Sequence, residues 1–424
     1  MATSELEKRR DIARKCMKCG FCQFFCPVYQ EEFTESSVAR GRQMFVRNVL
    51  DGKQELTPEL ADRFNRCTLC KTCETFCPSK APTAELVIAT RADIVAERGL
   101  DFKKRTVFRM FLKNRSLLAA GVKWASWFQW MTPETEGREG KVRHLPTFLE
   151  GLSKGRQIPS LPSKQLRQVL PEVISPPPGV ATRMKVGFFS GCSTELLYPE
   201  SGEKLAHLLA SQGCEVHFPR AQGCCGTPVM TSGDFELARE LADVNVAALG
   251  EYDVVVSGCA SCSSTLKEYE HYLADNDERK EAYAAFKAKV RGVNEFFFGE
   301  LDLDPSNLKL KEEYAGKKVT WHDPCHLARY QNVREQPRRL LQGVEGLEYV
   351  EMPNADRCCG MAGSFTLYYY ETSKGIAEKK AEGIRATEAD LVVTECPGCV
   401  MQITDIVAQR EMPQKVIHFL ELFE

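Results

Sequence analysis

The sequence predicts an α+β multidomain protein, with a mostly helical N-terminal module, a helical linker and two α/β domains that contain parallel sheets. A four-cysteine run occurs twice near the N-terminus, and a five-cysteine pattern occurs twice in the second half, where continuous apolar runs alternate with helical stretches. The chain has 424 residues, which is too long for one hydrophobic core. We expect the four parts at residues 1–100, 101–183, 184–303 and 304–424.

The N-terminal part contains two runs of the form Cys-x2-Cys-x2-Cys-x3-Cys-Pro. This is the bacterial spacing for two [4Fe–4S] cubane clusters, in which the fourth cysteine of each run binds the other cluster. We therefore expect one cubane on Cys16, Cys19, Cys22 and Cys77, and the other on Cys67, Cys70, Cys73 and Cys26. Zinc sites or disulfides are the alternatives, but zinc sites usually need two Cys-x2-Cys pairs each. Because Ser36–Leu50 and Leu86–Ala96 have helical apolar spacing, this module is predicted to be a mostly helical dicluster ferredoxin.

The linker begins with a stretch, Phe102 to Pro133, that has seven cations, seven large aromatic side chains and no acidic residue. Three of the four tryptophans of the chain lie there, at Trp124, Trp127 and Trp130. Such a stretch packs its aromatic rings on a neighbouring domain, docks another subunit or lies at a membrane surface. The prolines between residues 154 and 182 then predict an extended connection.

Residues 184–424 contain an internal repeat. Each copy has an apolar run that ends at a cysteine, then Cys-Cys-Gly, then a second apolar run that is closed by Cys-x2-Cys. Continuous apolar runs are typical of buried parallel strands, and ligands collect at the carboxyl ends of such strands. All five cysteines of each copy fall at or just after a predicted strand end, so each copy is predicted to be a cluster-binding α/β domain.

An adjacent cysteine pair is awkward for an ordinary cube and suits a cluster that is opened along one edge. Here the sequence resembles the cysteine-rich CCG domain family, which occurs in heterodisulfide reductase subunits and in iron–sulfur subunits of glycolate, lactate and anaerobic glycerol-3-phosphate oxidoreductases. The resemblance implies one or two further [4Fe–4S] clusters, of the non-cubane type. The ligands that it implies are Cys192, Cys224, Cys225, Cys259 and Cys262, then Cys325, Cys358, Cys359, Cys396 and Cys399. A zinc or purely structural role for one repeat is the alternative.

The order of a dicluster module, a linker and two CCG repeats resembles the glycolate oxidase iron–sulfur subunit over the whole chain. Both closing Cys-x2-Cys pairs are complete here, which is more similar to heterodisulfide reductase and to lactate-oxidising relatives. Cys214 matches no motif position and is predicted to be a buried thiol. His322 and His326 flank Cys325 and are candidates for extra ligands or proton donors, but such histidines more often satisfy a local hydrogen bond, which is the interpretation that we adopt.

No Gly-x-Gly-x-x-Gly fingerprint and no P-loop is present, so we expect no flavin or nicotinamide site on this chain. Clusters pass single electrons and cannot accept a hydride from an organic substrate. The resemblance therefore implies the electron-transfer subunit of a flavin-dependent 2-hydroxyacid (lactate or glycolate) dehydrogenase complex. The implied partners are an FAD-containing dehydrogenase subunit and a quinone, a membrane subunit or an electron-transfer flavoprotein. The alternatives are a heterodisulfide reductase-like catalytic subunit, which acts on a disulfide or thiol, and the iron–sulfur subunit of an anaerobic glycerol-3-phosphate dehydrogenase.

The net charge and the N-terminal sequence limit the classes of partner and the cellular location that we expect. A formal net charge of −2 indicates no nucleic-acid partner. The N-terminus has no apolar stretch of a secretory signal, and the chain has no run of about 18 apolar residues that would span a membrane. We therefore expect a cytoplasmic protein, either free or peripheral on the inner face of the cell membrane. In that compartment the 19 cysteines are expected to bind metal rather than to form disulfides.

Overall fold

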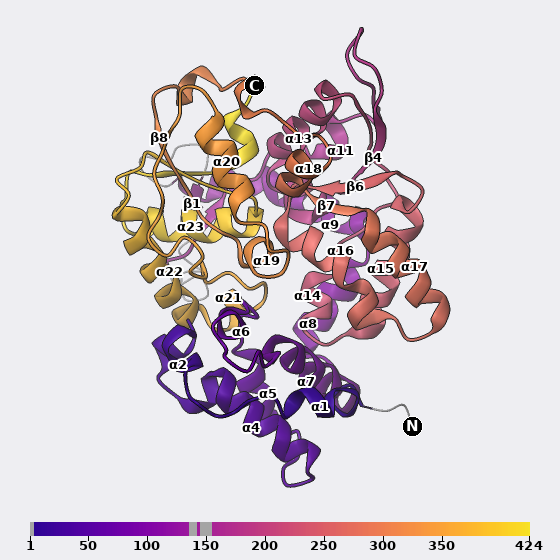
Figure 1. The fold of residues 1–424 in the computed structure, drawn as a ribbon, viewed down its shortest axis with the longest axis vertical. Coiled ribbons are helices and arrows are strands. Elements are labelled where there is room, and N and C mark those ends of the chain that lie inside the picture. Colours follow the sequence, from indigo (N-terminus) through magenta and orange to yellow (C-terminus); the bar gives the residue numbers. More distant parts are fainter. Residues whose placement is uncertain (1–3, 135–141, 145–154) are drawn as a thin grey trace.

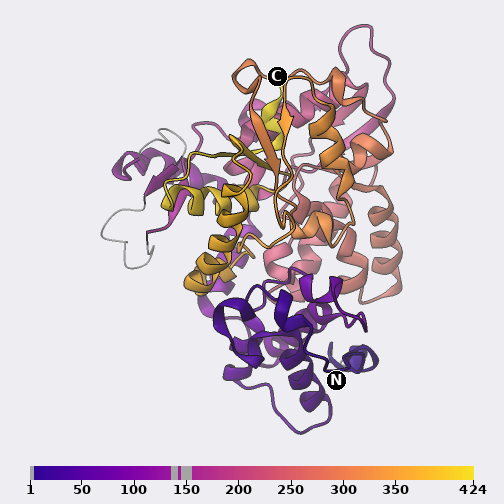
Figure 2. The same cartoon turned by 60° about the vertical axis from the view of Figure 1, so that its left-hand side comes forward.

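The computed structural model describes residues 4–134, 142–144 and 155–424 (Figure 1). The N-terminal module lies at one end of the molecule, and the two repeats of the second half lie side by side next to it (Figures 1 and 2). Parts of the predicted linker, residues 135–141 and 145–154, lie outside the described residues. The predicted combination of a helical module with two parallel-sheet units is confirmed.

Residues 4–100 form helices and turns and contain no strand, as predicted. The helices are α1 (Arg10–Ala13), α2 (Cys22–Phe25), α3 (Tyr29–Glu32), α4 (Ala39–Leu50), α5 (Pro58–Asn65), α6 (Thr72–Thr75) and α7 (Thr83–Arg98). The two predicted helices are thus α4 and α7. Thr57 begins α5, because its hydroxyl accepts a hydrogen bond from the Leu60 N–H at 3.3 Å. The rings of Phe25 and Phe76, from the two cysteine runs, stack with centroids 4.0 Å apart.

The first part of the linker is helical and runs along the first repeat. It consists of α8 (Phe102–Thr106), a π-helical turn η3 (Val107–Leu112), α9 (Arg115–Phe128) and η4 (Gln129–Met131). Arg109 pairs with Glu236 at 3.1 Å and Lys113 pairs with Glu240 at 2.7 Å, so part of the positive charge faces the repeat. Trp124, Trp127 and Trp130 are instead exposed, each by more than 60%. The interpretation that this stretch packs its aromatic rings on a neighbouring domain is therefore wrong for the three tryptophans.

Short elements follow α9 along the proline-containing stretch. Strand β1 (Val142–His144) pairs antiparallel with β2 (Gln157–Pro159), and α11 (Leu166–Val169) leads to β3 (Val173–Ile174). Strand β3 pairs antiparallel with β5 (Cys214–His217) and so becomes an edge strand of the first sheet. The extended connection therefore ends inside the sheet of the first repeat.

Apart from the additional edge strand β3 of the first repeat, the two repeats have the same sheet topology. The first sheet has the order β3-β5-β4-β6-β7, with β4 (Met184–Phe188), β6 (Val254–Ser257) and β7 (Val290–Gly292) parallel to β5. The second sheet has the order β11-β10-β8-β9, with β8 (Lys318–Trp321), β9 (Glu348–Tyr349), β10 (Leu391–Thr394) and β11 (Lys415–His418) all parallel. In both sheets the first strand of the repeat lies between the second and the third. This order places the ends of these strands next to one another at one edge of each sheet.

Helices surround both sheets. The first repeat contains α12 (Gly191–Leu196), α13 (Pro199–Ser211), α14 (Thr227–Met230), α15 (Phe235–Leu249), α16 (Ala260–Leu273), α17 (Asp277–Lys289) and α18 (Val293–Gly299). The second contains α19 (Cys325–Ala328), α20 (Glu335–Gly343), α21 (Phe365–Tyr368), α22 (Tyr370–Arg385), α23 (Pro397–Gln409) and η8 (Phe419–Leu422). Among the described residues, no helix is both long enough and apolar enough to cross a bilayer.

The two repeats share a buried interface. Glu395, at the end of β10, is fully buried and accepts hydrogen bonds from the Val293 N–H at 3.1 Å and the Asn294 amide at 2.5 Å. Burial raises the pKa of Glu395 to about 8. The Ala260 N–H also donates to the Glu395 carbonyl, at 2.9 Å. These bonds join the carboxyl ends of β6 and β7 to that of β10, and the closing cysteine pairs begin at the ends of β6 and β10.

Candidate metal centres

The first cysteine site lies at the surface of the N-terminal module. Cys16, Cys19 and Cys22 come from the loop before α2 and from its first residue, and Cys77 follows α6. These four cysteines line one small cavity, as the spacing predicts. The Arg47 guanidinium donates to the carbonyls of three residues of the chain that enters the loop, including Cys16 at 2.6 Å. Cys19 is exposed, so this site reaches the solvent.

The second cysteine site lies deeper in the same module. It contains Cys26, Cys67, Cys70 and Cys73, whose sulfurs interact electrostatically with one another. Burial, despite the nearby Arg42 cation, raises the pKa of Cys26 to about 12. The exchange of the fourth cysteine between the two runs, which the spacing predicts, therefore agrees with how the structure groups these residues.

The first five-cysteine site lies at the carboxyl ends of the strands of the first sheet. Cys192 is in α12 after β4, Cys224 and Cys225 follow β5, and Cys259 and Cys262 follow β6. Their side chains form one series of thiol hydrogen bonds, from Cys192 to Cys224, Cys225, Cys262 and Cys259. The structure thus brings together all five residues that the resemblance implies.

The second five-cysteine site has the same position on the second sheet. Cys325 follows β8, Cys358 and Cys359 follow β9, and Cys396 and Cys399 follow β10. The Cys359 and Cys399 sulfurs are 3.5 Å apart, and Cys399 also hydrogen-bonds Cys396. Cys325 interacts electrostatically with Cys359 and Cys396. Unlike the first site, one member of the adjacent pair, Cys358, hydrogen-bonds Cys70 of the N-terminal module.

The glycine of each Cys-Cys-Gly shapes the loop around the adjacent pair. Gly226 and Gly360 have φ values of +83° and +93°, which glycine adopts without steric cost. Their N–H groups donate to Cys224 Sγ and Cys358 Sγ, each at 3.4 Å. A Cβ atom on Gly360 would lie 2.5 Å from the Ser373 carbonyl oxygen, so no larger residue fits there without a backbone shift.

The four sites follow one another without a break. Cys73 of the second site also lines the cavity of the first. A hydrogen bond from the Cys358 thiol lowers the pKa of Cys70 well below its ordinary value, so the second site touches the second five-cysteine site. Cys396 hydrogen-bonds Cys259, and ten cysteines of the two repeats line one cavity of about 210 Å³ together with Cys67. The order is therefore the surface site, the deeper site of the module, the second five-cysteine site and the first.

Hydrogen bonds with both repeats hold the N-terminal module against this cavity. Arg329 is buried and donates to the Cys70 carbonyl at 3.4 Å and to the Asp356 carbonyl at 2.6 Å. The Tyr330 hydroxyl donates to the Leu69 carbonyl at 2.7 Å. From the module itself, Arg91 donates to the Thr231 carbonyl of the first repeat at 2.7 Å. The contact between Cys70 and Cys358 therefore belongs to a polar interface.

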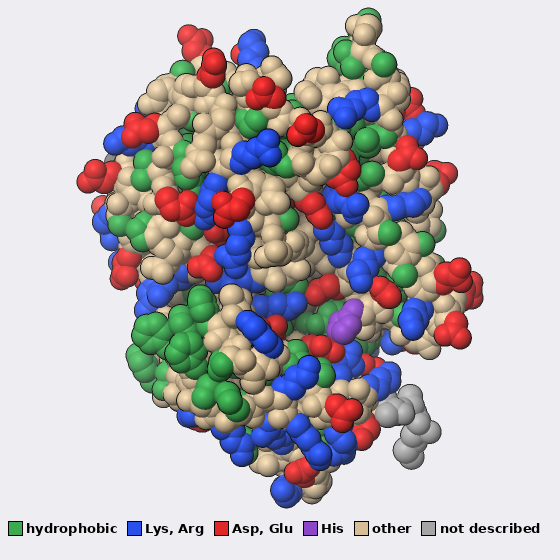
Figure 3. Space-filling view, in the orientation of Figure 1, with side chains coloured by type: hydrophobic (Ala, Val, Ile, Leu, Met, Phe, Trp, Pro, Cys, Tyr) green, Lys and Arg blue, Asp and Glu red, His purple; other side chains and the backbone are tan. Residues whose placement is uncertain are grey.

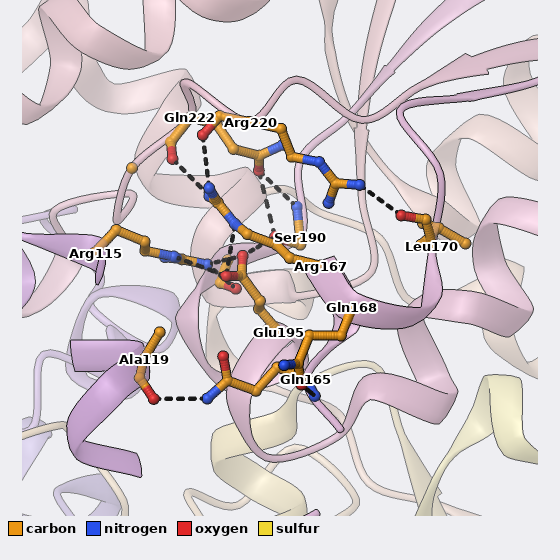
Figure 4. Close-up of polar contacts among 12 residues, drawn as sticks. Arg115, Ala119, Gln165, Arg167, Gln168, Leu170, Ser190, Glu195, Arg220 and Gln222 are labelled. Atoms are coloured by element: carbon orange, nitrogen blue, oxygen red, sulfur yellow. Dashed lines mark hydrogen bonds and ion pairs between the residues drawn. The ribbon is translucent and has the colours of Figure 1, made fainter. Parts of the chain in front are cut away.

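A buried ion cluster fixes the linker beside the first five-cysteine site (Figure 4). Glu195, in α12 three residues after Cys192, is fully buried and pairs with Arg115 of α9 and, at 2.7 Å, with Arg167 of α11. The Arg115 guanidinium also donates to the Gly191 carbonyl at 2.9 Å. One carboxylate thus connects two linker helices to the residues that carry Cys192.

Sequence reasoning missed several residues at these sites. It gave no role to Arg329, Arg115 or Lys380, whose ammonium is buried and donates to two carbonyls of the loop before Cys358. Burial lowers the pKa of Lys380 to about 8. The interpretation of His326 agrees with its contact to the Ser264 hydroxyl at 3.1 Å. For His322 the support is weaker, because among the described residues neither ring nitrogen makes a hydrogen bond of ordinary geometry and the Ala355 carbonyl is only a weaker polar contact. Cys214 is buried, as predicted.

The donor set fits iron–sulfur clusters. All nineteen cysteines are free thiols, and eighteen of them gather in the four sites. Buried thiolates without a cation are costly, whereas iron binds the thiolate form and offsets its charge. Backbone N–H groups donate to sulfur in all four sites, for example from Leu69 to Cys67 at 3.4 Å, which is a typical second layer around such clusters.

Comparison with known proteins agrees with this organisation. The family model of the cysteine-rich CCG domain matches residues 186–267 and 319–404, and that of a 4Fe-4S dicluster domain matches residues 12–81. The chain is 34% identical over 239 residues to lactate utilization protein A of Geobacillus thermodenitrificans, which covers 56% of this chain and 98% of that protein. It is 34% identical over 242 residues to a fumarate reductase (CoM/CoB) subunit of Methanothermobacter marburgensis, which covers 57% of this chain and 46% of that protein.

A further relative aligns with almost the whole chain. The probable glycolate oxidase iron-sulfur subunit of Bacillus subtilis is 31% identical over 433 residues, which cover 99% of this chain and 95% of that protein. The predicted resemblance is thus confirmed, both in its domains and in their combination on one chain. The chain belongs to the family of CCG-domain iron–sulfur proteins that includes this probable glycolate oxidase subunit.

Proposed function

We propose that this chain is the iron–sulfur electron-transfer subunit of a flavin-dependent complex that oxidises a 2-hydroxyacid, lactate or glycolate. The observation that carries the proposal is the unbroken order of four cysteine sites, from exposed Cys19 to the cavity between the repeats. When bound, [4Fe–4S] clusters supply one-electron transfer, which a carrier between a flavin and a second acceptor requires. Relatives named for glycolate oxidase and for lactate utilization support this class of substrate.

The proposed ligands are the eighteen cysteines of the four sites. The first two sites, with four cysteines each, would hold cubane clusters, and one or both five-cysteine sites would hold a non-cubane cluster. The protein holds these groups in place: Arg47 and the loop glycines position the thiols, and Arg329 fixes the module against the repeats. The boundaries at residues 100, 183 and 303 belong to the same proposal.

An aromatic surface surrounds the exposed end of this series. Phe21, Phe24 and Phe76 lie over α2 and the first site, are exposed by 53%, 73% and 40%, and form the apolar patch on the lower left of Figure 3. Phe25 lies beneath them, with its ring centroid 5.0 Å from that of Phe24. Apolar exposed patches of this kind mark protein contact sites. We propose that the FAD-containing subunit contacts this surface, because a cysteine site reaches the solvent there.

The test uses the full chain with assembled clusters and a separately purified FAD-containing lactate or glycolate dehydrogenase subunit from the same organism. Addition of the acid should reduce the clusters only when both proteins are present. Phe24→Ser should slow this reduction without loss of iron, whereas Phe102→Ser, which changes an equally exposed ring of the linker, should not. Flavin in the pure chain, or oxidation of the acid by the chain alone, would contradict the proposal.

A second candidate function is catalysis on a thiol or disulfide, as in heterodisulfide reductase-like enzymes. The cavity between the five-cysteine sites favours it, because the apolar side chains of Met361 and Phe365 and the imidazole of His326 line it together with the ten cysteines. Thiol-dependent release of electrons to a dye, with no flavoprotein present, would support this function. It should fail in Cys225→Ser and Cys359→Ser if the cavity is the site.

A further inference from the structure

One buried histidine has no explanation in the packing of the second repeat. His322 follows β8 directly and is 1% exposed. Its backbone N–H donates to the Val393 carbonyl at 3.0 Å, but among the described residues neither nitrogen of its ring makes a hydrogen bond of ordinary geometry, and the Ala355 carbonyl is only a weaker polar contact of the ring. Buried polar side chains are nearly always paired, so an unpaired imidazole here indicates a partner of another kind.

The ring faces two sulfurs of the second five-cysteine site. A ring nitrogen of His322 and the sulfurs of Cys359 and Cys399 all lie within 4.8 Å of one another, and all three residues are buried. The two sulfurs are 3.5 Å apart. Imidazole nitrogen and thiolate sulfur are both good ligands for iron, so these three atoms have the chemistry and the spacing of ligands on one metal ion.

The first repeat shows what this position looks like without a ligand. Phe189 occupies the matching place: it follows β4, precedes Cys192 by three residues, and its N–H donates to the Val256 carbonyl at 2.9 Å. Phe189 is fully buried and offers no donor atom. The fold therefore accepts an apolar ring here, and the imidazole of the second repeat is not needed for packing.

We infer that His322 is a nitrogen ligand of the iron–sulfur cluster in the second five-cysteine site, on an iron that Cys359 and Cys399 also bind. The inference rests on the proposed function, since it requires a cluster at that site. Unlike a Rieske centre, where histidine takes the place of cysteine, this site would keep its five thiolates and gain a neutral imidazole. The two repeats would therefore hold clusters with different ligand sets and unequal potentials.

The test is pulsed electron paramagnetic resonance of the full chain with assembled clusters, grown with ¹⁵N-histidine. A strong ¹⁵N coupling should appear in the wild type, disappear in His322→Phe and persist in His326→Gln, because the His326 ring already contacts Ser264. His322→Phe copies the first repeat, and His322→Gln is a second variant that should also lose the coupling. A redox titration should show the potential of the second repeat's cluster displaced in His322→Phe by at least tenfold in the reduction equilibrium, or about 59 mV for one electron, with the first repeat's potential unchanged.

The outcomes separate this inference from the function on which it rests. Full iron and sulfide content without a histidine coupling in the wild type would overturn the ligand role and leave the electron-transfer function standing. A coupling that persists in His322→Phe would also overturn it. A wild-type chain without iron in the second repeat would overturn both.

Discussion

The buried ion cluster at Glu195 makes a quantitative prediction for the linker. Glu195→Gln keeps the shape of the side chain but leaves the guanidinium groups of Arg115 and Arg167, whose side chains are 11% and 23% exposed, without their carboxylate. Removal of one partner from a buried pair costs about 3–5 kcal/mol. Because the amide still accepts a hydrogen bond, we expect the low end, about 3 kcal/mol, which corresponds to roughly a 100-fold increase in local opening.

The matched control is Glu236→Gln, which removes the partner of Arg109 on the same linker. That pair is exposed, by 44% and 75%, and exposed pairs contribute about 0–1 kcal/mol. Hydrogen exchange of the α9 amides measures both effects, with at most a roughly fivefold change in the control. Equal exchange in the two variants, or unchanged α9 amides in Glu195→Gln, would refute the conclusion that the buried carboxylate holds the linker.

Three further predictions concern the cysteine sites and the linker surface. Gly360→Ala should lower the iron content of the second repeat more than Gly226→Ala lowers that of the first. Both variants place alanine in a left-handed backbone conformation, which destabilises each loop by about 1–2 kcal/mol. Only at Gly360 would the added Cβ also meet a carbonyl oxygen, at 2.5 Å. Cys225→Ser and Cys359→Ser should each abolish or convert the cluster of their own repeat, seen by electron paramagnetic resonance; an unchanged signal would contradict the five-ligand proposal. In vesicle flotation, the chain should not bind anionic vesicles through residues 102–133, because ion pairs with the first repeat neutralise part of the positive charge of this stretch. Strong, salt-sensitive binding would instead favour a membrane-surface role for the stretch.

The local part of this architecture was predictable because its causes are local in the sequence. The cysteine spacing of the N-terminal runs limits which thiols can reach one cluster, so it predicts the exchange of Cys26 and Cys77 without a structure, and the grouping of the sulfurs is compatible with that prediction. Continuous apolar runs similarly predicted β4, β6, β8 and β10. The edge strand β3 has only two residues and lies among prolines, so no periodic pattern marks it.

The contacts between distant segments were not predictable in this way. Cys70 and Cys358 meet because Arg329 and Tyr330 bind backbone carbonyls of the module. Every residue has a backbone carbonyl, so such a contact cannot be inferred from the residue types. Glu195 and Arg115 are 80 positions apart, and neither stands in a recognisable motif. A comparison of the two repeats could have marked His322, since the matching position holds phenylalanine, but a single histidine next to a cysteine is more often a hydrogen-bonded residue.

The order of the sites assigns different positions to two similar repeats. The second repeat touches the N-terminal module through Cys358 and the first repeat through Cys396, so it lies between them in the series. Two identical repeats would not give electron transfer along this series a direction, because the direction of transfer depends on differences in reduction potential between the sites. The polar surroundings differ between the repeats: Glu195 and Arg115 are buried beside Cys192 in the first, whereas Lys380 and His322 are buried beside the cysteines of the second. Duplication thus supplied two copies of one scaffold, and the buried polar residues are where the copies became chemically distinct.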